Sequence, residues 1–252
     1  MIRYRLNILG ITLAAATLFF SVRAVFWLYG MVTNEFFYGM SEEDIFAYAL
    51  EDGGYFGGGE QMLIGTIVIV LAVEYAAPKE NAVYLVRYPE RMSYLGVRLA
   101  VVISTCIGIT VCKFIVAYCF LAIQFNSQLL LSTESIRRFS SGLLLFSIYA
   151  VRCGLVYMIV RDLLGKKNLA MGITVVIYFL ELYIWADNLL GLPVASMWMP
   201  FRDLSASFDF VIGKVSGVGL SLVAVRQIGM TLLCLLIWGK VWKDKDVINL
   251  EK

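Results

Sequence analysis

Three ionisable side chains, Lys113, Arg152 and Glu181, interrupt long apolar runs of this sequence. Charges in a hydrocarbon environment are costly, so such residues mark transport pathways, or buried ion pairs that fix the register of helices. Helices through these runs, at 1.5 Å per residue, would place the three charges about 14 to 21 Å from the same end. Arg152 and Glu181 are expected to pair, because their runs are joined by the short turn Asp162–Asn168. A polar lining of a substrate path and a structural ion pair both remain open.

The charge of Lys113 must be compensated in another way, because the Glu181 carboxylate cannot neutralise both Arg152 and Lys113. Either Lys113 faces a wet cavity, or a second polypeptide supplies the acid. Arg23 lies nearer the outer end of its apolar run, so its long side chain is expected to reach the interface, and it receives no role.

The elements that must position these charges are six apolar runs. Hydrophobic residues make up 60% of the 252 and charged residues 16%, which is too apolar for an ordinary soluble domain. A helix needs about 20 residues to cross a bilayer. The expected crossings are Leu6–Val32, Gln61–Ala77, Leu99–Ile123, Leu143–Val160, Leu169–Leu190 and Leu222–Trp242. We therefore predict an all-α integral membrane protein with six transmembrane helices, forming one domain over residues 1–252.

The distribution of basic residues predicts the orientation. If the N-terminus is cytosolic, most Lys and Arg residues fall in cytosolic segments, and few fall outside. The segment Thr33–Glu60 agrees, because it holds seven acidic residues and no basic one. The positive-inside rule thus places both termini in the cytosol.

Absences in the sequence narrow the chemistry. The chain has no histidine, which excludes HExxH zinc chemistry, Ser-His-Asp triads and Cys-His pairs. It has no G-x-x-x-x-G-K-[ST] motif, so it cannot hold ATP in the Walker manner. The five cysteines fall within expected spans at spacings that fit no zinc site, and the net charge of +2 is too small to indicate nucleic acid. We expect neither an enzyme nor a metal site.

The segment between the second and third expected spans is a candidate for transmitting force. Glu74 closes the second span, and the stretch Asn81–Arg98, here called the elbow, follows. Pro89 should end a short amphipathic helix and begin the next one, with Glu90 in its first turn opposing the helix dipole. The elbow also carries Arg87 and Arg91. It fits equally a rigid coupling element and an interfacial helix lying on anionic lipid.

In these features the chain resembles the permease subunits of ABC transporters of the type-2 exporter class. The resemblance is carried by six spans with cytosolic termini, by Glu74, by the elbow with Arg87 and Arg91, and by the long segment Leu192–Ser221 before the last span. It covers the whole chain in topology.

The resemblance implies that the elbow is a coupling helix seated on a separate ABC ATPase subunit, with Glu74, Arg87, Pro89, Glu90 and Arg91 as its coupling residues. ATP and Mg would then be bound by that partner, and this chain would hold no cofactor. The resemblance also implies a second permease half, identical or homologous, that encloses the path with this one in a bacterial cell membrane.

The segment Leu192–Ser221 is apolar in patches and interrupted by prolines and charges. It fits two short re-entrant helices that dip into the outer leaflet, which the resemblance also implies, or an ordinary extracytosolic loop. We expect the re-entrant form.

These features together predict an exporter for an amphipathic or hydrophobic cargo: an antimicrobial peptide (exported, or expelled for self-immunity), a drug or a lipid. The apolar membrane path favours such a cargo, and the acidic segment Thr33–Glu60 could attract a cationic peptide. The alternative, from a different class, is a non-transporting membrane protein that binds a partner or sequesters a toxic peptide.

Overall fold

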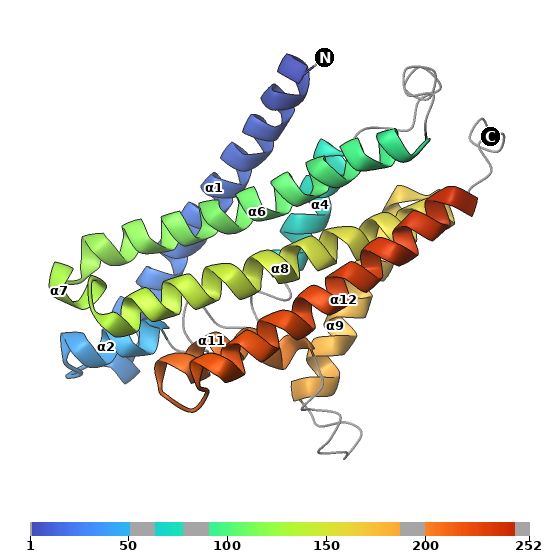
Figure 1. The fold of residues 1–252 in the computed structure, drawn as a ribbon. Coiled ribbons are helices and arrows are strands. Elements are labelled where there is room, and N and C mark those ends of the chain that lie inside the picture. Colours follow the sequence, from blue (N-terminus) through green and yellow to red (C-terminus); the bar gives the residue numbers. More distant parts are fainter. Residues whose placement is uncertain (1, 51–63, 78–90, 187–199, 245–252) are drawn as a thin grey trace.

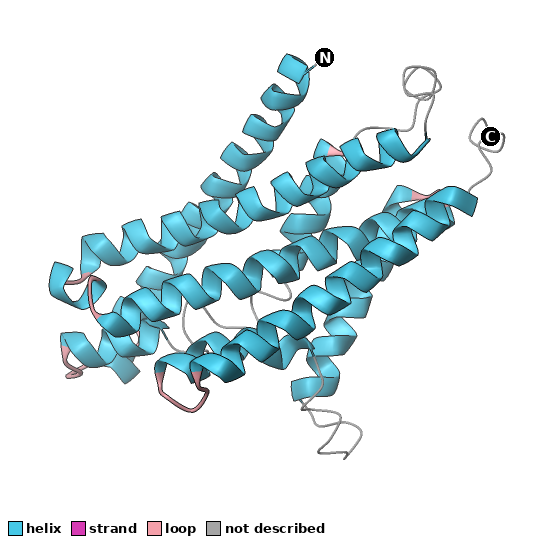
Figure 2. Ribbon diagram, in the orientation of Figure 1, coloured by secondary structure: helices cyan, strands magenta, loops and turns pink. Residues whose placement is uncertain are grey.

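The computed structural model describes residues 2–50, 64–77, 91–186 and 200–244 (Figure 1). Within these residues every regular element is a helix and no strand occurs (Figure 2). The elements are α1 (Ile2–Thr33), η1 (Glu35–Phe37), α2 (Glu42–Leu50), α4 (Thr66–Ala76), α6 (Arg91–Gln124), α7 (Ser127–Leu130), α8 (Thr133–Leu164), α9 (Lys167–Ala186), α11 (Pro200–Val211) and α12 (Gly217–Asp244). The all-α prediction is confirmed for this part of the chain.

Four helices, α1, α6, α8 and α12, are long and apolar enough to cross a membrane. This pattern is typical of a membrane protein. The two other predicted crossings coincide with α4, an apolar helix of 11 residues, and with α9, a helix of 20 residues. The predicted range of each extends into residues outside the described part, before α4 and after α9.

Helix α8 is the centre of the bundle. α4, α6, α9, α11 and α12 all pack against it, whereas α1 packs on α4 and α6 at the periphery (Figure 1). Large apolar side chains of α12, among them Leu222 and Leu236, point away from the other helices. Lipid is the natural surrounding for such a surface, because an exposed apolar face of this size is rare in water.

Local sequence signals explain where α8 begins and ends. The Ser132 hydroxyl accepts the backbone N–H of Ser135 at 3.2 Å, which caps the first turn. Gly165 ends the helix with φ of 65°, a conformation that glycine adopts without strain. Helix α9 begins two residues later, so α8 and α9 form the tight hairpin expected from the sequence.

Helix α6 packs closely against α8 at two glycines of α8, Gly142 and Gly154, and the approach is tightest at Gly154. A Cβ atom at Gly154 would lie 2.8 Å from Cys106 Sγ and 3.0 Å from Val102 Cγ1, which are both on α6. Small residues allow membrane helices to approach in this way, and the approach brings the polar residues of α8 within reach of its neighbours.

The two ends of the bundle differ. The short helices α2, α7 and α11 gather at one end, and the α8–α9 turn and the C-terminal end of α12 lie at the other (Figure 1). We call these the short-helix end and the hairpin end. The N-terminal half of α1 diverges from the bundle (Figure 1).

Candidate functional site

A buried ion pair joins α6 to α8 near the hairpin end. The Arg98 guanidinium donates to both carboxylate oxygens of Asp162, at 3.1 and 3.0 Å, and neither side chain has any exposed surface. The indole N–H of Trp238, on α12, donates to Asp162 at 2.7 Å. The guanidinium carbon lies 4.7 Å from the ring centroid of Trp242. A fully buried pair of this kind persists because hydrogen bonds and aromatic contacts compensate both charges.

A second ion pair lies beside it and joins α4 to α8. Arg161 Nη1 lies 3.0 Å from Glu74 Oε2, and the Tyr157 hydroxyl donates to the same oxygen. Glu74 is the residue singled out in the sequence at the end of the second apolar run. The structure gives it partners on α8 that the sequence did not indicate.

Arg161 and Asp162 are consecutive residues, so one short stretch of α8 holds three other helices. Arg161 binds Glu74 on α4, and Asp162 binds Arg98 on α6 and Trp238 on α12. We call these residues together with Tyr157 the clamp. The described part of α4 ends at Ala77, and α6 begins at Arg91. The clamp residues of α8 therefore bind both helices that flank residues 78–90, which are α4 and α6.

The predicted coupling residues divide between described and undescribed parts of the chain. Glu74 lies in the clamp, and Arg91 is the first residue of α6. Arg87, Pro89 and Glu90 lie outside the described residues. Arg98, at the end of the elbow, is the elbow residue that enters the clamp.

The expected pair of Arg152 and Glu181 is present. Arg152 Nη2 lies 3.5 Å from Glu181 Oε1, and Arg152 Nη1 lies 3.7 Å from the sulfur of Met230 on α12. The rings of Tyr149 and Tyr178 lie 5.5 and 5.7 Å from the guanidinium carbon. The Arg152 side chain is 4% exposed and that of Glu181 14%, so the carboxylate is the more accessible partner. The hairpin turn predicted this pair correctly.

Lys113 has aromatic surroundings. Its amine lies 5.0 Å from the ring centroid of Phe146 and 5.8 Å from that of Phe114. It also lines a cavity of about 20 Å³ together with Thr110 and Tyr149. Such a cavity holds about one water molecule. The sequence left two ways to compensate the Lys113 charge, a wet cavity or an acid from a second polypeptide. The cavity beside the amine provides the space that the first of these requires.

A polar network at the short-helix end holds α11 in place. Arg138 on α8 is buried, donates through Nε to the carbonyl of Leu50 at 2.8 Å, and donates through Nη1 to the hydroxyl of Ser207 on α11. Asp203 on α11 is also buried and accepts a hydrogen bond from Arg226 Nε on α12 at 3.0 Å. The segment expected to form re-entrant helices thus contains α11 and the first residues of α12, and α11 is bonded to α8 and α12 and, through Arg138, to α2. Residues 192–199 lie outside the described part.

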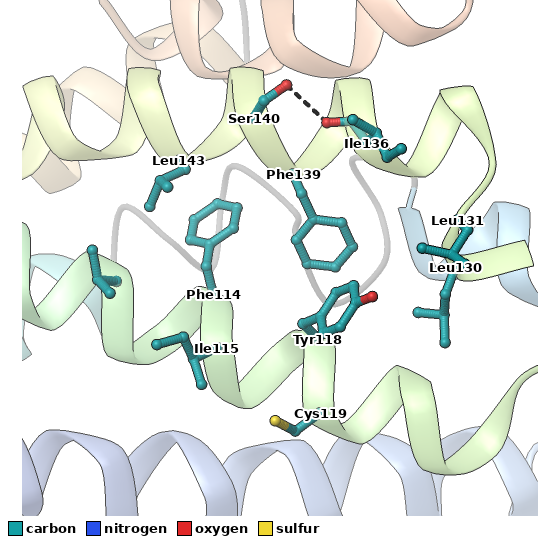
Figure 3. Close-up of a pocket in the computed structure, with 11 residues that line it drawn as sticks. Phe114, Ile115, Tyr118, Cys119, Leu130, Leu131, Ile136, Phe139, Ser140 and Leu143 are labelled. Atoms are coloured by element: carbon teal, nitrogen blue, oxygen red, sulfur yellow. Dashed lines mark hydrogen bonds between the residues drawn. The ribbon is translucent and has the colours of Figure 1, made fainter. Parts of the chain in front are cut away.

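An apolar groove of about 430 Å³ lies between α6 and α8 toward the short-helix end (Figure 3). Tyr118 and Phe139 meet edge to face across it, with ring centroids 5.2 Å apart. The hydroxyl of Ser140 donates to the carbonyl of Ile136, within α8 itself. The groove therefore presents hydrocarbon and aromatic surface, which suits an apolar ligand.

Comparison of the chain with protein-family models, curated proteins and solved structures finds no match.

Proposed function

We propose that this chain is the membrane-spanning subunit of an ATP-driven ABC exporter. It has six transmembrane helices, formed by α1, α4, α6, α8, α9 and α12, and both termini lie in the cytosol of a bacterial cell. A separate ABC ATPase subunit binds ATP and Mg and hydrolyses ATP, and a second permease half completes the path. The cargo is amphipathic or hydrophobic, with an antimicrobial peptide favoured over a drug or a lipid.

The clamp is the observation that carries this proposal. A partner that pushes on residues 78–90 needs a rigid connection to the spanning helices. Glu74 and Arg98 supply one on either side of that segment, because both are held by adjacent residues of the central helix α8. The bond from Asp162 to Trp238 extends the connection to α12. A force applied at the elbow thus reaches four helices through polar contacts.

The intramembrane charges support a path beside α8. Glu181 keeps part of its carboxylate accessible, and its partner Arg152 is buried. A purely structural pair gains nothing from exposure, whereas a carboxylate in a pathway must be reached by its cargo. We assign Glu181, Arg152 and Lys113 to the lining of that path.

The short-helix end supports an outer gate. The helix α11 carries Asp203 and Ser207, which bind α12 and α8 through Arg226 and Arg138. A movement of α8 or α12 therefore moves α11 as well. We propose that α11 is a re-entrant helix that closes the outer mouth of the path.

Co-purification from native membranes tests the proposal. The full chain, extracted in mild detergent, should bring down a stoichiometric protein with an ATP-binding cassette and vanadate-sensitive ATP hydrolysis. Charge reversal at the elbow (Arg87→Glu with Arg91→Glu) should release that protein. The matched control is Lys240→Glu with Lys243→Glu, which reverses two exposed charges on α12 at the same end.

Two results would contradict the proposal: a chain that functions undiminished without an ATPase, or elbow charges that are accessible from outside the cell. The first result would favour a membrane protein that binds a partner or sequesters a toxic peptide without transport.

A further inference from the structure

The apolar groove between α6 and α8 has the length of two turns of helix. Its wall on α6 runs from Val111 to Cys119, about 12 Å, and its wall on α8 runs from Ile136 to Leu143, about 10 Å. An amphipathic helix that binds in a groove inserts apolar side chains at positions i, i+3, i+4 and i+7, which also span about 10 Å. The groove therefore fits the apolar face of a short helix.

The lining recognises apolar groups and is open from outside the bundle. Tyr118 and Phe139 meet across the groove, and the Phe114 ring lies 6.2 Å from that of Phe139, measured between centroids (Figure 3). Ile115 and Ile136, one on each wall, are both 56% exposed. A ligand can thus enter from the side without separating α6 from α8.

One end of the groove is closed by α7, and a carboxylate is held at this end. Leu130, the last residue of α7, lines the groove, and its N–H donates to the carbonyl of Asn126. The backbone N–H of Asn126 in turn donates to Glu42 Oε1 of α2 at 2.8 Å. Contact between the rings of Phe46 and Phe125, with centroids 5.1 Å apart, also holds α2 there. The Glu42 carboxylate is therefore fixed about one helical turn from the lining.

The charge that a ligand meets at the α7 end is negative. The first turn of α2 carries three exposed acidic side chains: Glu42, Glu43 and Asp44. Among the residues that the structure describes, none of these three forms an ion pair. The basic residue beside the α8 wall, Arg137, is turned toward α11, with its guanidinium carbon 5.6 Å from the Phe210 ring centroid. Lys113, beside the α6 wall, is buried against Phe146.

This charge distinguishes a peptide from a phospholipid as the ligand. An acyl chain also fits an apolar groove, but the phosphate of a lipid at the α7 end would lie near the Glu42 carboxylate, and like charges repel. A Lys or Arg side chain at the same place would be attracted. An amphipathic helix with basic residues on its polar face satisfies both the groove and the carboxylate.

We infer that the groove between α6 and α8 binds an amphipathic helix of a cationic peptide, with its apolar face in the groove and a basic side chain near Glu42. The inference rests on the proposed function only in making this peptide the cargo, because binding requires neither an ATPase nor transport. The short-helix end is the outer end in the proposed orientation, so the groove would receive the peptide from the outer leaflet.

Fluorescence anisotropy tests the inference with the full-length protein in phosphatidylcholine nanodiscs and with empty nanodiscs as the blank. The probes are two labelled amphipathic helices, one built from leucine and lysine and the other from leucine and glutamate. The lysine peptide should bind at least tenfold more tightly than the glutamate peptide. Equal affinities, or no binding beyond that of empty nanodiscs, overturn the inference.

Glu42→Gln isolates the contribution of the charge, because the amide oxygen can still accept the N–H of Asn126. The substitution should weaken binding of the lysine peptide about two- to fivefold, the range for one exposed ion pair. The matched control is Glu134→Gln, since Glu134 is an exposed acid of α8 that projects about 160° around the helix from Ile136. It should leave the affinity unchanged. Equal losses would indicate general attraction to the acidic end and would overturn the inference.

A second pair of variants tests the groove itself. Ser140 lines the groove, and Leu144, one turn later on α8, is exposed but is not part of the lining. Ser140→Phe should fill the groove and weaken peptide binding at least tenfold, whereas Leu144→Phe should not. If Ser140→Phe instead converts a dimer to a monomer and peptide binding does not change, a second copy of the chain occupies the groove and the inference is wrong.

Photocrosslinking identifies the occupant of an unfilled groove. Benzoylphenylalanine at position 136 should crosslink to the lysine peptide, and at position 144 it should not. Crosslinks from position 136 to phosphatidylcholine alone would assign the groove to lipid and overturn the inference. Peptide binding by a protein that brings down no ATPase would retain this inference and contradict the proposed function, and an ATPase partner without peptide binding would do the reverse.

Discussion

Arg98 and Asp162 are 64 residues apart in the sequence, and they form a bidentate ion pair with no exposed side-chain surface. The pair lies between the helix that leaves the elbow and the central helix of the bundle. A contact of this kind is sensitive to the loss of one partner, because the other charge is then buried without compensation.

Asp162→Ala should lower the free energy of unfolding by about 3 to 5 kcal/mol, because it leaves the Arg98 charge buried in the bundle without a counter-charge. Thermal unfolding of the purified protein in detergent measures this change. The double variant Arg98→Met with Asp162→Leu should recover most of the stability, because apolar side chains of similar size can replace a buried pair. A single variant as stable as the wild type would show that the pair is not a structural contact.

Trp238→Phe removes one donor to Asp162 and keeps most of the aromatic surface. We expect a loss of about 1 to 3 kcal/mol, the cost of leaving a buried acceptor without that bond. The same substitution in the Arg98→Met, Asp162→Leu background should cost much less, because the acceptor is gone. Equal losses in both backgrounds would assign the effect to packing instead of the hydrogen bond.

Gly154→Ala should destabilise the bundle by about 1 to 3 kcal/mol, because the added methyl group meets Cys106 and Val102 on α6. Removing the sulfur by Cys106→Ala in the same chain should recover part of the loss. Gly172→Ala is the control, since a Cβ there meets no atom within 4 Å. That change should stabilise α9 by up to about 1 kcal/mol. Unfolding curves of the four proteins provide the comparison.

For the proposed exporter, Glu181→Gln should reduce ATP-driven transport while the protein still assembles. The amide keeps an oxygen for Arg152 but has no charge to offer a cargo. Accumulation of a fluorescent amphipathic peptide in inverted membrane vesicles measures transport, and scanning calorimetry measures stability. A fall in the melting temperature with unchanged transport would assign the residue to helix register instead.

Arg138→Met should release α11, because the buried guanidinium joins Leu50 and Ser207 across three helices. Hydrogen exchange of the Pro200–Val211 amides should become faster than in the wild type. Arg137→Met is the neighbouring control: Arg137 is exposed, and its guanidinium carbon lies 5.6 Å from the Phe210 ring centroid. Its loss should change the exchange less, since exposed cation–π contacts contribute only about 0.5 to 1 kcal/mol.

The sequence predicted the helical class and the pair of Arg152 and Glu181, for reasons that are visible in the structure. Hydropathy measures how apolar a stretch is, and α1, α6, α8 and α12 are each apolar over a stretch long enough to cross a membrane. The pair followed from the short turn between two long helices, which makes them neighbours. Both inferences use local information.

The clamp could not be predicted in the same way. The fourth crossing was expected to end at Val160, which left Arg161 outside the span and Asp162 in the following turn, but α8 continues to Leu164. It also begins at Thr133, ten residues before the expected Leu143, so Arg138 lies on the helix as well. Hydropathy does not locate such helix ends, because a helix can continue past its apolar run where its polar side chains bind residues of other helices. Those partners are distant in sequence.

The adjacency of Arg161 and Asp162 has a mechanical consequence. Consecutive residues of an α-helix project about 100° apart around its axis, so the two side chains reach toward different neighbours. Rolling α8 about its axis would turn both side chains through the same angle, so it would disturb both contacts at once. A rotation of α8 is therefore passed on to α4 and α6 together, because each of them is bound by one of the two adjacent residues.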